Sequence, residues 1–444
     1  MESSKGKTPD ISTSADVSTK QRRIAQLAEQ APDMAMNLSH LMDLNWFKEA
    51  YRRTRKDGAV GIDGQNGREY GERLEGNLCD LINRAKSGRY RAPAVRRKQI
   101  PKVGTPGETR PIGIPTFEDK VLQRAVVMAL EAVFEQDFLD CSYGFRPGRS
   151  AHQAIKKLRE DLWDMGGGYV IDLDIRKYFD TIDHSQIQAI FHRRVRDGVI
   201  RRLVGKWLNA GVMEKRVIFH PETGVPQGGV ISPMLSNMYL HEVLDSWFAK
   251  TVQPRLKGKS CMVRFADDAV LAFERKDDAE RVMAVLPKRF SKYGLTLHPE
   301  KTNLLCFKRP TGSGDGTKAP DTFMFLGFLH FWARSRKGYW VIKRRTAKDR
   351  FSRFGKALSQ WLRVIRHEPI RVQHEALCAK LRGHFQYYGI TGNSGSLSRA
   401  LLLAHRLWRK WLGRRSNKAH RNWEWFNELL QKFPLPKPRI VHQC

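Results

Sequence analysis

Two adjacent carboxylates, Asp267 and Asp268, are enclosed by apolar sequence. Val263 and Phe265 precede the pair and an apolar run over 269–273 follows, which predicts a strand, a tight turn with both acids, and a second strand. Neighbouring carboxylates repel each other, and partial burial favours their protonated forms. A hard divalent cation such as Mg²⁺ relieves the repulsion and keeps coordination positions open for substrate phosphates. The same pair in an exposed turn would only be solvated, so a third carboxylate is needed to decide.

A candidate third carboxylate lies in the segment 169–175, Tyr-Val-Ile-Asp-Leu-Asp-Ile. Side chains alternate between the faces of a strand, so Asp172 and Asp174 share one face. An antiparallel sheet with helices behind it would gather three carboxylates at its strand ends. Two metal ions held there could activate a primer 3′-hydroxyl and steady the leaving pyrophosphate. Asp172 is either a second acid of this kind or a partner for nearby Lys and Arg.

A predicted β-hairpin over residues 96–115 carries Lys102 on one arm and Arg110 on the other, with a turn containing Gly and Pro between them. Two cations on facing strands could hold a triphosphate, because arginine forks onto phosphate oxygens. A hairpin at the edge of a sheet, where charged side chains prevent pairing with another chain, has the same pattern. The local sequence leaves both interpretations open.

Two loops have compositions that suggest close contacts. The loop 142–150 combines aromatic residues with Arg146 and Arg149, which could stack on and clamp a strand, although a packed Pro-Gly turn has the same composition. The loop 224–230 is rich in glycine, which permits close backbone approach. Ser232 and Pro233 then have the chemistry that starts a helix.

Charge is the strongest compositional signal in the 444 residues. Lys and Arg number 79 against 46 Asp and Glu, so the formal net charge is +33. Such an excess favours a polyanionic partner, and its spread over the whole chain favours nucleic acid over a membrane surface. The six cysteines are scattered without a Cys-x-x-Cys pair, which argues against a zinc module and suits a reducing compartment. No signal-peptide core or membrane-spanning stretch is present, so we expect a cytoplasmic protein.

Periodicity predicts the elements that must position these residues. Residues 1–20 are polar and expected to be disordered. Apolar spacing predicts helices over 21–55, 74–86, 117–138 and 278–293. An apolar strand over 323–328 is expected to pair through a turn with 339–342, and the chain beyond residue 343 is expected to be mostly helical and very basic.

From about residue 40 to the end, the ordered set of motifs resembles bacterial group II intron-encoded reverse transcriptases and maturases. Phe265-Ala266-Asp267-Asp268 is similar to the Tyr-Ala-Asp-Asp box, with Phe in place of Tyr. Asp174, with the aromatic Phe179 five residues later, resembles the first metal-binding motif, and this register selects Asp174 over Asp172. The other matching motifs are residues 143–149 in the fingers, 226–229 with 232–237 beside template and nucleotide, and 381–389 in the maturase region, or domain X.

This resemblance implies an α+β fold: a right-hand polymerase of fingers and a palm with an antiparallel sheet, followed by a helical thumb/maturase domain and a basic C-terminal segment. We therefore expect a disordered tail over 1–20, an N-terminal extension and the start of the fingers over 21–90, fingers with some palm over 91–165, the palm with its carboxylates over 166–335, thumb and domain X over 336–413, and a basic DNA-binding tail over 414–444.

The resemblance also implies roles for individual residues. Asp174, Asp267 and Asp268 would be catalytic and, with Ile175, would bind two Mg²⁺ ions, or Mn²⁺ in their place. Phe179 would be a steric gate that favours dNTPs over rNTPs. The implied dNTP-binding residues are Lys102, Arg110, Phe179, Gln227 and Lys301. The implied template and primer contacts are Arg146, Arg149, Gly228, Phe325 and Gly327. The implied intron RNA contacts are Arg382, Gly383, His384, Tyr387 and Tyr388.

The expected function is RNA-directed DNA synthesis together with binding of the host group II intron RNA, to assist splicing and retromobility by target-primed reverse transcription. The expected partners are the intron RNA, an RNA template with a DNA primer, target DNA and dNTPs, without a membrane, in the bacterial cytoplasm at the nucleoid. A maturase that only binds RNA, and a relative recruited to phage defence, are the alternatives. The His-Asn-His and Cys pairs of the family's endonuclease module are missing from the tail, so we expect no second-strand cleavage.

Overall fold

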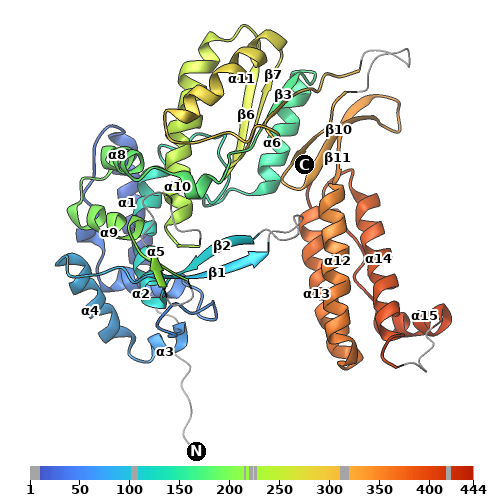
Figure 1. Cartoon of the computed structure of the whole chain (residues 1–444), viewed down its shortest axis with the longest axis horizontal. Coiled ribbons are helices and arrows are strands. Elements are labelled where there is room, and N and C mark those ends of the chain that lie inside the picture. Colours follow the sequence, from blue (N-terminus) through green and yellow to red (C-terminus); the bar gives the residue numbers. More distant parts are fainter. Residues whose placement is uncertain are drawn as a thin grey trace, which may run out of the picture.

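Four antiparallel strands in the order β6–β7–β3–β8 form the central sheet of the computed structural model (Figure 1). The structure describes residues 11–101, 109–214, 217–219, 224, 228–310, 320–416 and 422–443. The strands of the central sheet are β3 (Tyr169–Leu173), β6 (Ser260–Phe265), β7 (Asp268–Phe273) and β8 (Asn303–Cys306). The strand–turn–strand predicted around the Asp pair is confirmed, because β6 pairs with β7 up to Phe265 and Asp268.

The two faces of this sheet pack into different cores, as the period of two requires. Ile171 and Leu173 enter the larger core, which also contains Leu286 of helix α11 (Lys276–Ser291). Val170, on the opposite face, enters a second core with helix α6 (Ala151–Asp164). Asp172 alternates with the first set and therefore shares the face of Val170.

The N-terminal helices gather around α5 (Phe117–Phe134), most of whose side chains are buried. Trp46 Nε1 donates a hydrogen bond to the Ala125 carbonyl at 2.9 Å and anchors one of them on α5. The helices before α5 are α1 (Ile11–Gln30), α2 (Leu44–Arg53), α3 (Gly67–Gly71) and α4 (Leu74–Lys86), with one short 3₁₀ turn, Ser39–Leu41. The range predicted for the helix over 74–86 is confirmed.

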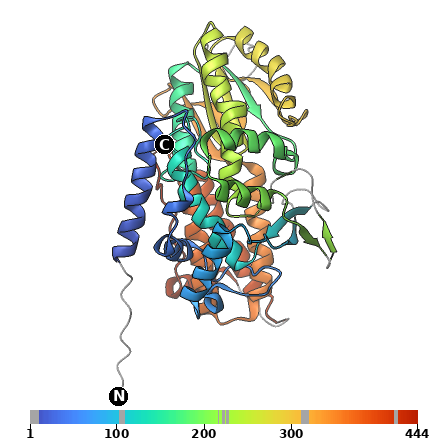
Figure 2. The same cartoon turned by 90° about the vertical axis from the view of Figure 1, so that its left-hand side faces the viewer.

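The expectation of disorder over residues 1–20 is corrected, because α1 already begins at Ile11. Val17 and Ile24 are buried on one side of this helix, and Gln21 Nε2 donates to the Met128 carbonyl of α5 at 2.8 Å. Packing on α5 therefore orders a segment whose composition alone is too polar to predict a helix. Figure 2 shows α1, in dark blue, along one edge of the molecule. Residues 1–10 lie outside the described residues.

The predicted basic hairpin is confirmed as β1 (Val95–Pro101) and β2 (Thr109–Ile114), which pair from Arg96 with Ile114 to Pro101 with Thr109. Strands β4 (Val212–Glu214) and β5 (Val217–Phe219) extend this sheet in the order β2–β1–β4–β5. In Figure 1 the hairpin points from the N-terminal helices toward the C-terminal helices. The turn and Lys102 lie outside the described residues.

Short helices connect the two sheets. They are α7 (Tyr178–Thr181), α8 (His184–Arg194), α9 (Gly198–Leu208) and α10 (Ser232–Leu240). The chain beyond α10 continues in wider π-helical turns over His241–Ser246 and Phe248–Val252, followed by a 3₁₀ turn, Gln253–Arg255.

A small sheet, in the order β11–β10–β9, joins the central sheet to the C-terminal helices. Its strands are β9 (Phe323–Phe325), β10 (Phe328–Arg334) and β11 (Trp340–Thr346). The single strand predicted over 323–328 is wrong, because the chain reverses at Leu326 and Gly327, whose φ angles are 50° and 81°. A two-residue turn with both φ positive matches the twist of a hairpin, so β9 pairs with β10.

The C-terminal helices are α12 (Lys348–Val364), α13 (Ile370–Tyr388), α14 (Ser394–Leu412) and α15 (Trp423–Lys432), with a 3₁₀ turn at Ile365–His367. The predicted helical region beyond residue 343 is confirmed. Phe426 of α15 is fully buried in the core of this bundle. The segment 414–444 is therefore partly a structural element of the bundle, and DNA binding by it stays a prediction. None of the described helices is both long and apolar enough to cross a bilayer.

Candidate active site

The strand register brings the predicted carboxylates together. Leu173 of β3 pairs with Ala269 of β7, so Asp174 and Asp268, one step further, lie opposite each other where the two strands end. Asp267 lies in the turn between β6 and β7. The sheet therefore gathers three acids from distant parts of the chain at one edge, as the sequence predicts.

These acids disturb one another electrostatically. Loss of hydration and the charges of Asp267 and Asp174 raise the pKa of Asp268 to about 6. Burial, with the charges of Asp268 and Asp174, raises the pKa of Asp172 to about 7. Burial also raises the pKa of Asp267. Accumulated negative charge of this kind favours cations at the site.

The acids fit a metal ion that is shared with a substrate. No group of three or more His, Cys, Asp and Glu side chains in the described part of the chain could hold a metal ion by itself. Mg²⁺ is usually held by one or two carboxylates together with water and substrate phosphates, so no preformed cage is required. The hydrogen bonds from Arg176 N to Thr296 O and from His298 N to Asp174 O flank Ile175. The Ile175 carbonyl takes no part in this bridge and remains a candidate ligand.

Of the predicted dNTP contacts, Lys301 lies beside an acid and Arg110 acts on the acids electrostatically. Lys301 Nζ is 3.4 Å from Asp174 Oδ2, and its side chain is 55% exposed. Burial raises the pKa of Asp267, and the positive charge of Arg110 on β2 opposes that rise. Both cations are therefore in electrostatic range of the carboxylates. Lys102 and Gln227 lie outside the described residues.

The predicted gate residue, Phe179, is half-buried on α7, where its ring packs edge-on against Tyr178 with 5.2 Å between ring centroids. Gly224 approaches the same helix closely, since a Cβ atom there would be 2.9 Å from the Phe179 carbonyl oxygen. Gly228 has a φ of 106°, and a Cβ atom there would be 2.5 Å from the Gly113 carbonyl oxygen of β2. The predicted close backbone approach of this loop is confirmed, and it places the loop between α7 and the hairpin.

Arg264, whose role sequence reasoning missed, supports the Asp267 turn from behind. Its fully buried guanidinium donates to both carboxylate oxygens of Asp245 at 2.7 and 2.6 Å. It also donates to Asn237 Oδ1 at 3.1 Å and to Ser142 Oγ at 2.7 Å. A fifth bond, at 2.9 Å, goes to the carbonyl of Ala266, which has a φ of 57°. The sequence signal that could have indicated this role is the position of Arg264 between the apolar residues Val263 and Phe265 of a predicted strand.

The loop 142–150 also has a supporting function. Gly144 packs directly on the backbone of Ala266, where a Cβ atom would collide with the Ala266 nitrogen. The predicted nucleic-acid contact of Arg146 is corrected, because its buried guanidinium donates to Glu135 at 3.0 Å and to the Leu139 carbonyl at 2.7 Å. Arg149 is more accessible, although it forms an ion pair with Asp140 at 2.5 Å. It remains a predicted contact.

The predicted primer contact of Phe325 is corrected as well, because its side chain is buried in the second core. The neighbouring turn at Leu326 and Gly327 is more accessible, so the primer contact of Gly327 stays a prediction. Tyr387, a predicted RNA contact, donates a hydrogen bond from its hydroxyl to the Leu326 carbonyl at 2.9 Å.

Two further residues predicted to contact RNA pack against other aromatic side chains. His384 is buried beside Phe354, with 4.1 Å between ring centroids, and burial lowers its pKa to about 4. Tyr388 packs on Phe328 with 5.3 Å between ring centroids. The predicted direct RNA contact of His384 is therefore corrected to a packing role, whereas Tyr387 and Tyr388 are half-buried, Arg382 and Gly383 are exposed, and all four stay predictions.

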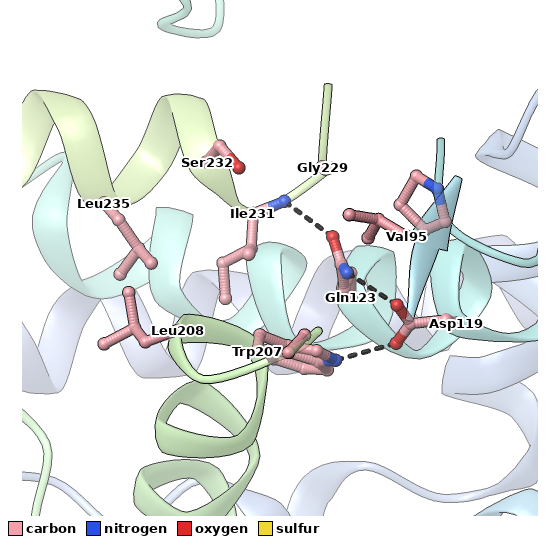
Figure 3. A pocket seen from close by; sticks show the side chains of 11 residues that line it. Val95, Asp119, Gln123, Trp207, Leu208, Gly229, Ile231, Ser232 and Leu235 are labelled. Carbon is pink, nitrogen blue, oxygen red and sulfur yellow. Dashed lines mark hydrogen bonds between the residues drawn. The ribbon is translucent and has the colours of Figure 1, made fainter. Parts of the chain in front are cut away.

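A second buried carboxylate, Asp119 of α5, lines a pocket together with Gly229 and Ile231 (Figure 3). It accepts hydrogen bonds from Tyr90 Oη at 2.6 Å, Trp207 Nε1 at 2.7 Å and Gln123 Nε2 at 2.9 Å. Gln123 in turn accepts a 3.2 Å bond from the backbone nitrogen of Ile231, which caps α10. The network fixes the start of α10 and thereby supports the loop before it.

The sequence is similar to those of several known proteins. A family model described as "Reverse transcriptase (RNA-dependent DNA polymerase)" matches residues 100–330. Protein YkfC of Escherichia coli (strain K12) is 33% identical over 390 residues, which are 79% of this chain and 97% of that protein. Group II intron-encoded protein LtrA of Lactococcus lactis subsp. cremoris is 38% identical over 169 residues, which are 38% of this chain and 28% of LtrA. Nuclear intron maturase 2, mitochondrial, of Arabidopsis thaliana is 28% identical over 179 residues, which are 31% of this chain and 24% of that protein. The chain thus spans nearly the whole length of YkfC and about a quarter of each intron protein.

Proposed function

Because the chain belongs to the reverse transcriptase (RNA-dependent DNA polymerase) family and is of the group II intron type, we propose that it synthesises DNA on an RNA template and assists the splicing and mobility of a host intron RNA. The observation that carries this proposal is the meeting of Asp174, Asp267 and Asp268 at one sheet edge. The right-hand polymerase fold supplies that edge, with the β1–β2 hairpin on one side and the helical bundle on the other (Figure 1).

The carboxylates and the Ile175 carbonyl would hold the divalent metal ions that reverse transcriptases use, and we propose two Mg²⁺ ions. Such ions, when bound, supply activation of the primer hydroxyl and charge for the leaving pyrophosphate. Lys301 lies beside Asp174 and would exchange that contact for an oxygen of the triphosphate. Arg110, Lys102 and Gln227 would complete the nucleotide site.

Phe179 would restrict the sugar of the incoming nucleotide. Its ring packs edge-on against Tyr178, and Gly224 lies close to its backbone carbonyl, so the contact with Tyr178 and the approach of Gly224 both limit its movement. We expect Phe179→Val to admit rNTPs. The ratio of dNTP to rNTP incorporation on one template measures this, and an unchanged ratio would remove Phe179 from the gate role.

Nucleic acid would be held by the positive surface. The net charge of +33 favours several phosphate contacts, among them Arg149, Arg382 and backbone at Gly228, Gly327 and Gly383. The proposed partners are the intron RNA, an RNA template with a DNA primer, and target DNA in the cytoplasm at the nucleoid. Raising the salt concentration is expected to weaken RNA binding steeply, and a flat dependence measured by filter binding would contradict the electrostatic account.

The deciding experiment is primer extension on an RNA template with Mg²⁺ and dNTPs. The wild type is expected to extend the primer, and the double variant Asp267→Asn with Asp268→Asn is expected to bind RNA equally well without extending it. Synthesis by the double variant would overturn the site assignment. If neither protein extends the primer while both bind RNA tightly, the protein is an RNA-binding maturase instead.

A further inference from the structure

The β10–β11 hairpin carries positive charge without neighbouring acids in the sequence. Between Asp321 and Asp349 there is no Asp or Glu, whereas the same stretch contains seven Lys and Arg residues: Arg334, Arg336, Lys337, Lys343, Arg344, Arg345 and Lys348. Among the described residues, no carboxylate forms an ion pair with a cation of the range Arg334–Lys343 or with Arg345, although Arg353 just beyond them is paired with Asp349 at 2.5 Å. The hairpin therefore has uncompensated charge, which favours a polyanionic partner.

The outer face of the β9–β10–β11 sheet is partly open to solvent. Side chains alternate along each strand, and the inner face, which includes Trp332, packs into the second core. On the outer face Leu329 pairs with Arg345, and Phe331 pairs with Lys343. These four side chains are half-buried or exposed, and none of them is part of a core within the described ranges. The face is thus available to a partner.

Aromatic rings lie beside the cations on this surface. The Arg345 guanidinium lies over the Phe331 ring, 5.2 Å from the ring centroid. At the tip of the hairpin, Arg334 lies over the Trp340 ring at 5.1 Å, and Tyr339 is 70% exposed. Unpaired nucleic acids stack their bases on aromatic rings and on guanidinium planes, while cations contact their phosphates. The hairpin presents both kinds of group.

The tip of this hairpin is separate from the predicted primer contact at Gly327. Strand β10 begins at Phe328, directly after that turn, and ends at Arg334. The two ends of a strand of this length are roughly 20 Å apart. In Figure 1 the β10–β11 hairpin lies at the edge of the molecule, above the C-terminal helices. A ligand at the tip is therefore not the reacting end of a primer.

We propose that the outer face and tip of the β10–β11 hairpin bind an unpaired segment of RNA, with Tyr339 stacking on a base and Arg336, Lys337 and Arg345 contacting phosphates. This inference rests on the proposed function only for the choice of RNA among polyanions. An unpaired segment is favoured over a duplex because a duplex keeps its bases stacked on one another and has no use for an exposed ring. Such a contact would hold the RNA outside the polymerase site.

The test is the binding of labelled oligouridine to the full chain, measured by fluorescence anisotropy while an excess of unlabelled RNA–DNA duplex occupies the polymerase site. Tyr339→Ala is expected to weaken binding about tenfold, the range of one lost base stack, and Tyr339→Phe is expected to retain wild-type affinity because the ring remains. Arg336→Ala with Lys337→Ala should weaken binding and lower the slope of log affinity against log salt by about 1 to 2, since two phosphate contacts are lost.

Lys288→Ala with Lys292→Ala is the matched control, because it removes the same charge from exposed positions at the end of α11. It should leave the affinity and the salt slope close to the wild-type values. Wild-type affinity of Tyr339→Ala, or an equal loss in the control, would overturn the proposal. An equal loss for a labelled RNA duplex would overturn it as well, because phosphate contacts alone would then account for the binding.

Primer extension on a short template tests the proposed function separately. Tyr339→Ala should extend the primer as the wild type does, and a large loss of extension would overturn the placement of the RNA contact outside the polymerase site. A wild-type protein that binds oligouridine through Tyr339 without extending a primer would overturn the polymerase function and support the RNA surface.

Discussion

Two acids in this molecule, Asp119 and Asp268, have a pKa of about 6, for different physical reasons. Full burial raises the pKa of Asp119, and three neutral donors, from Tyr90, Trp207 and Gln123, limit the rise. Loss of hydration also raises the pKa of Asp268, but there the charges of two further acids add to the rise.

The difference is that Asp119 receives its hydrogen bonds from the protein, whereas Asp268 is available to bind a ligand. Asp119 has hydrogen bonds from three directions and needs nothing from outside the chain. Among the described residues, the groups that act most strongly on Asp268 are other acids, and its side chain is exposed at the end of β7. A raised pKa alone therefore does not mark a functional site; the chemistry of the neighbouring groups does.

The largest expected effect sharpens this contrast at Asp268. Asp268→Asn should lower primer extension by roughly a thousandfold, because the charge that would hold a metal ion is lost. The same change should leave the thermal unfolding temperature unchanged or slightly higher, since it removes repulsion from Asp267. Single-turnover extension and thermal unfolding measure the two effects, with the exposed Asp277→Asn as a control. A large fall in stability would make Asp268 a structural acid like Asp119.

Asp119→Leu should produce the opposite result. It leaves three buried donors without an acceptor and should lower the free energy of unfolding by about 3–5 kcal/mol. Asp119→Asn keeps one acceptor oxygen and should lie between Asp119→Leu and the wild type. Urea unfolding at pH 7.5 measures this, and a loss below about 1 kcal/mol would show that the network contributes little.

Asp172 should show a smaller effect with a defined pH dependence. Burial, with the charges of Asp268 and Asp174, raises its pKa to about 7 in the fold, so the native state retains a proton that the unfolded chain has already lost. Stability therefore falls as the pH rises from about 4 to about 7. Asp172→Asn removes this cost and should stabilise the protein by up to about 4 kcal/mol above pH 7, and by progressively less toward pH 4. Unfolding without divalent ions at pH 4 and pH 8 measures this; an equal effect at both would contradict it.

The smallest expected effect is a shift in the pH profile of activity. Asp268 with a pKa of about 6 gains a proton as the pH falls, so primer extension should decrease below about pH 6. Metal ions compete with that proton, so raising Mg²⁺ should move the decrease toward lower pH. NaCl at matched ionic strength is the control. If the decrease in primer extension at low pH did not move when Mg²⁺ was raised, the protonation of Asp268 would not compete with metal binding.

Local sequence patterns were sufficient to predict the strands that carry the acids. The alternation around Asp174 and the apolar flanks of Asp267 predict the central strands and the face that Asp172 and Asp174 share. The basic hairpin and the helix over 74–86 follow from turn residues and helical spacing. These features depend on neighbours within a few residues, so the sequence alone contains the necessary information.

Roles that depend on distant partners could not be predicted in this way. Arg146 looks like a nucleic-acid contact until Glu135 and the Leu139 carbonyl are found beside it. Phe325 resembles a primer contact until a core closes over its ring. Arg264 belongs to the most informative motif in the sequence, yet its five hydrogen bonds involve residues up to 122 positions away.

The buried Arg264 ties the turn that contains Asp267 to three other segments, so this turn cannot be exchanged alone between related genes. Its acceptors come from Ser142, Asn237 and Asp245 as well as from the turn itself. A recombination breakpoint between Ser142 and Arg264 that brought in divergent partners would leave a guanidinium charge buried without its acceptors, a cost of about 3–5 kcal/mol. The stretch from the loop at 142 to the Asp pair is therefore expected to be inherited as one block.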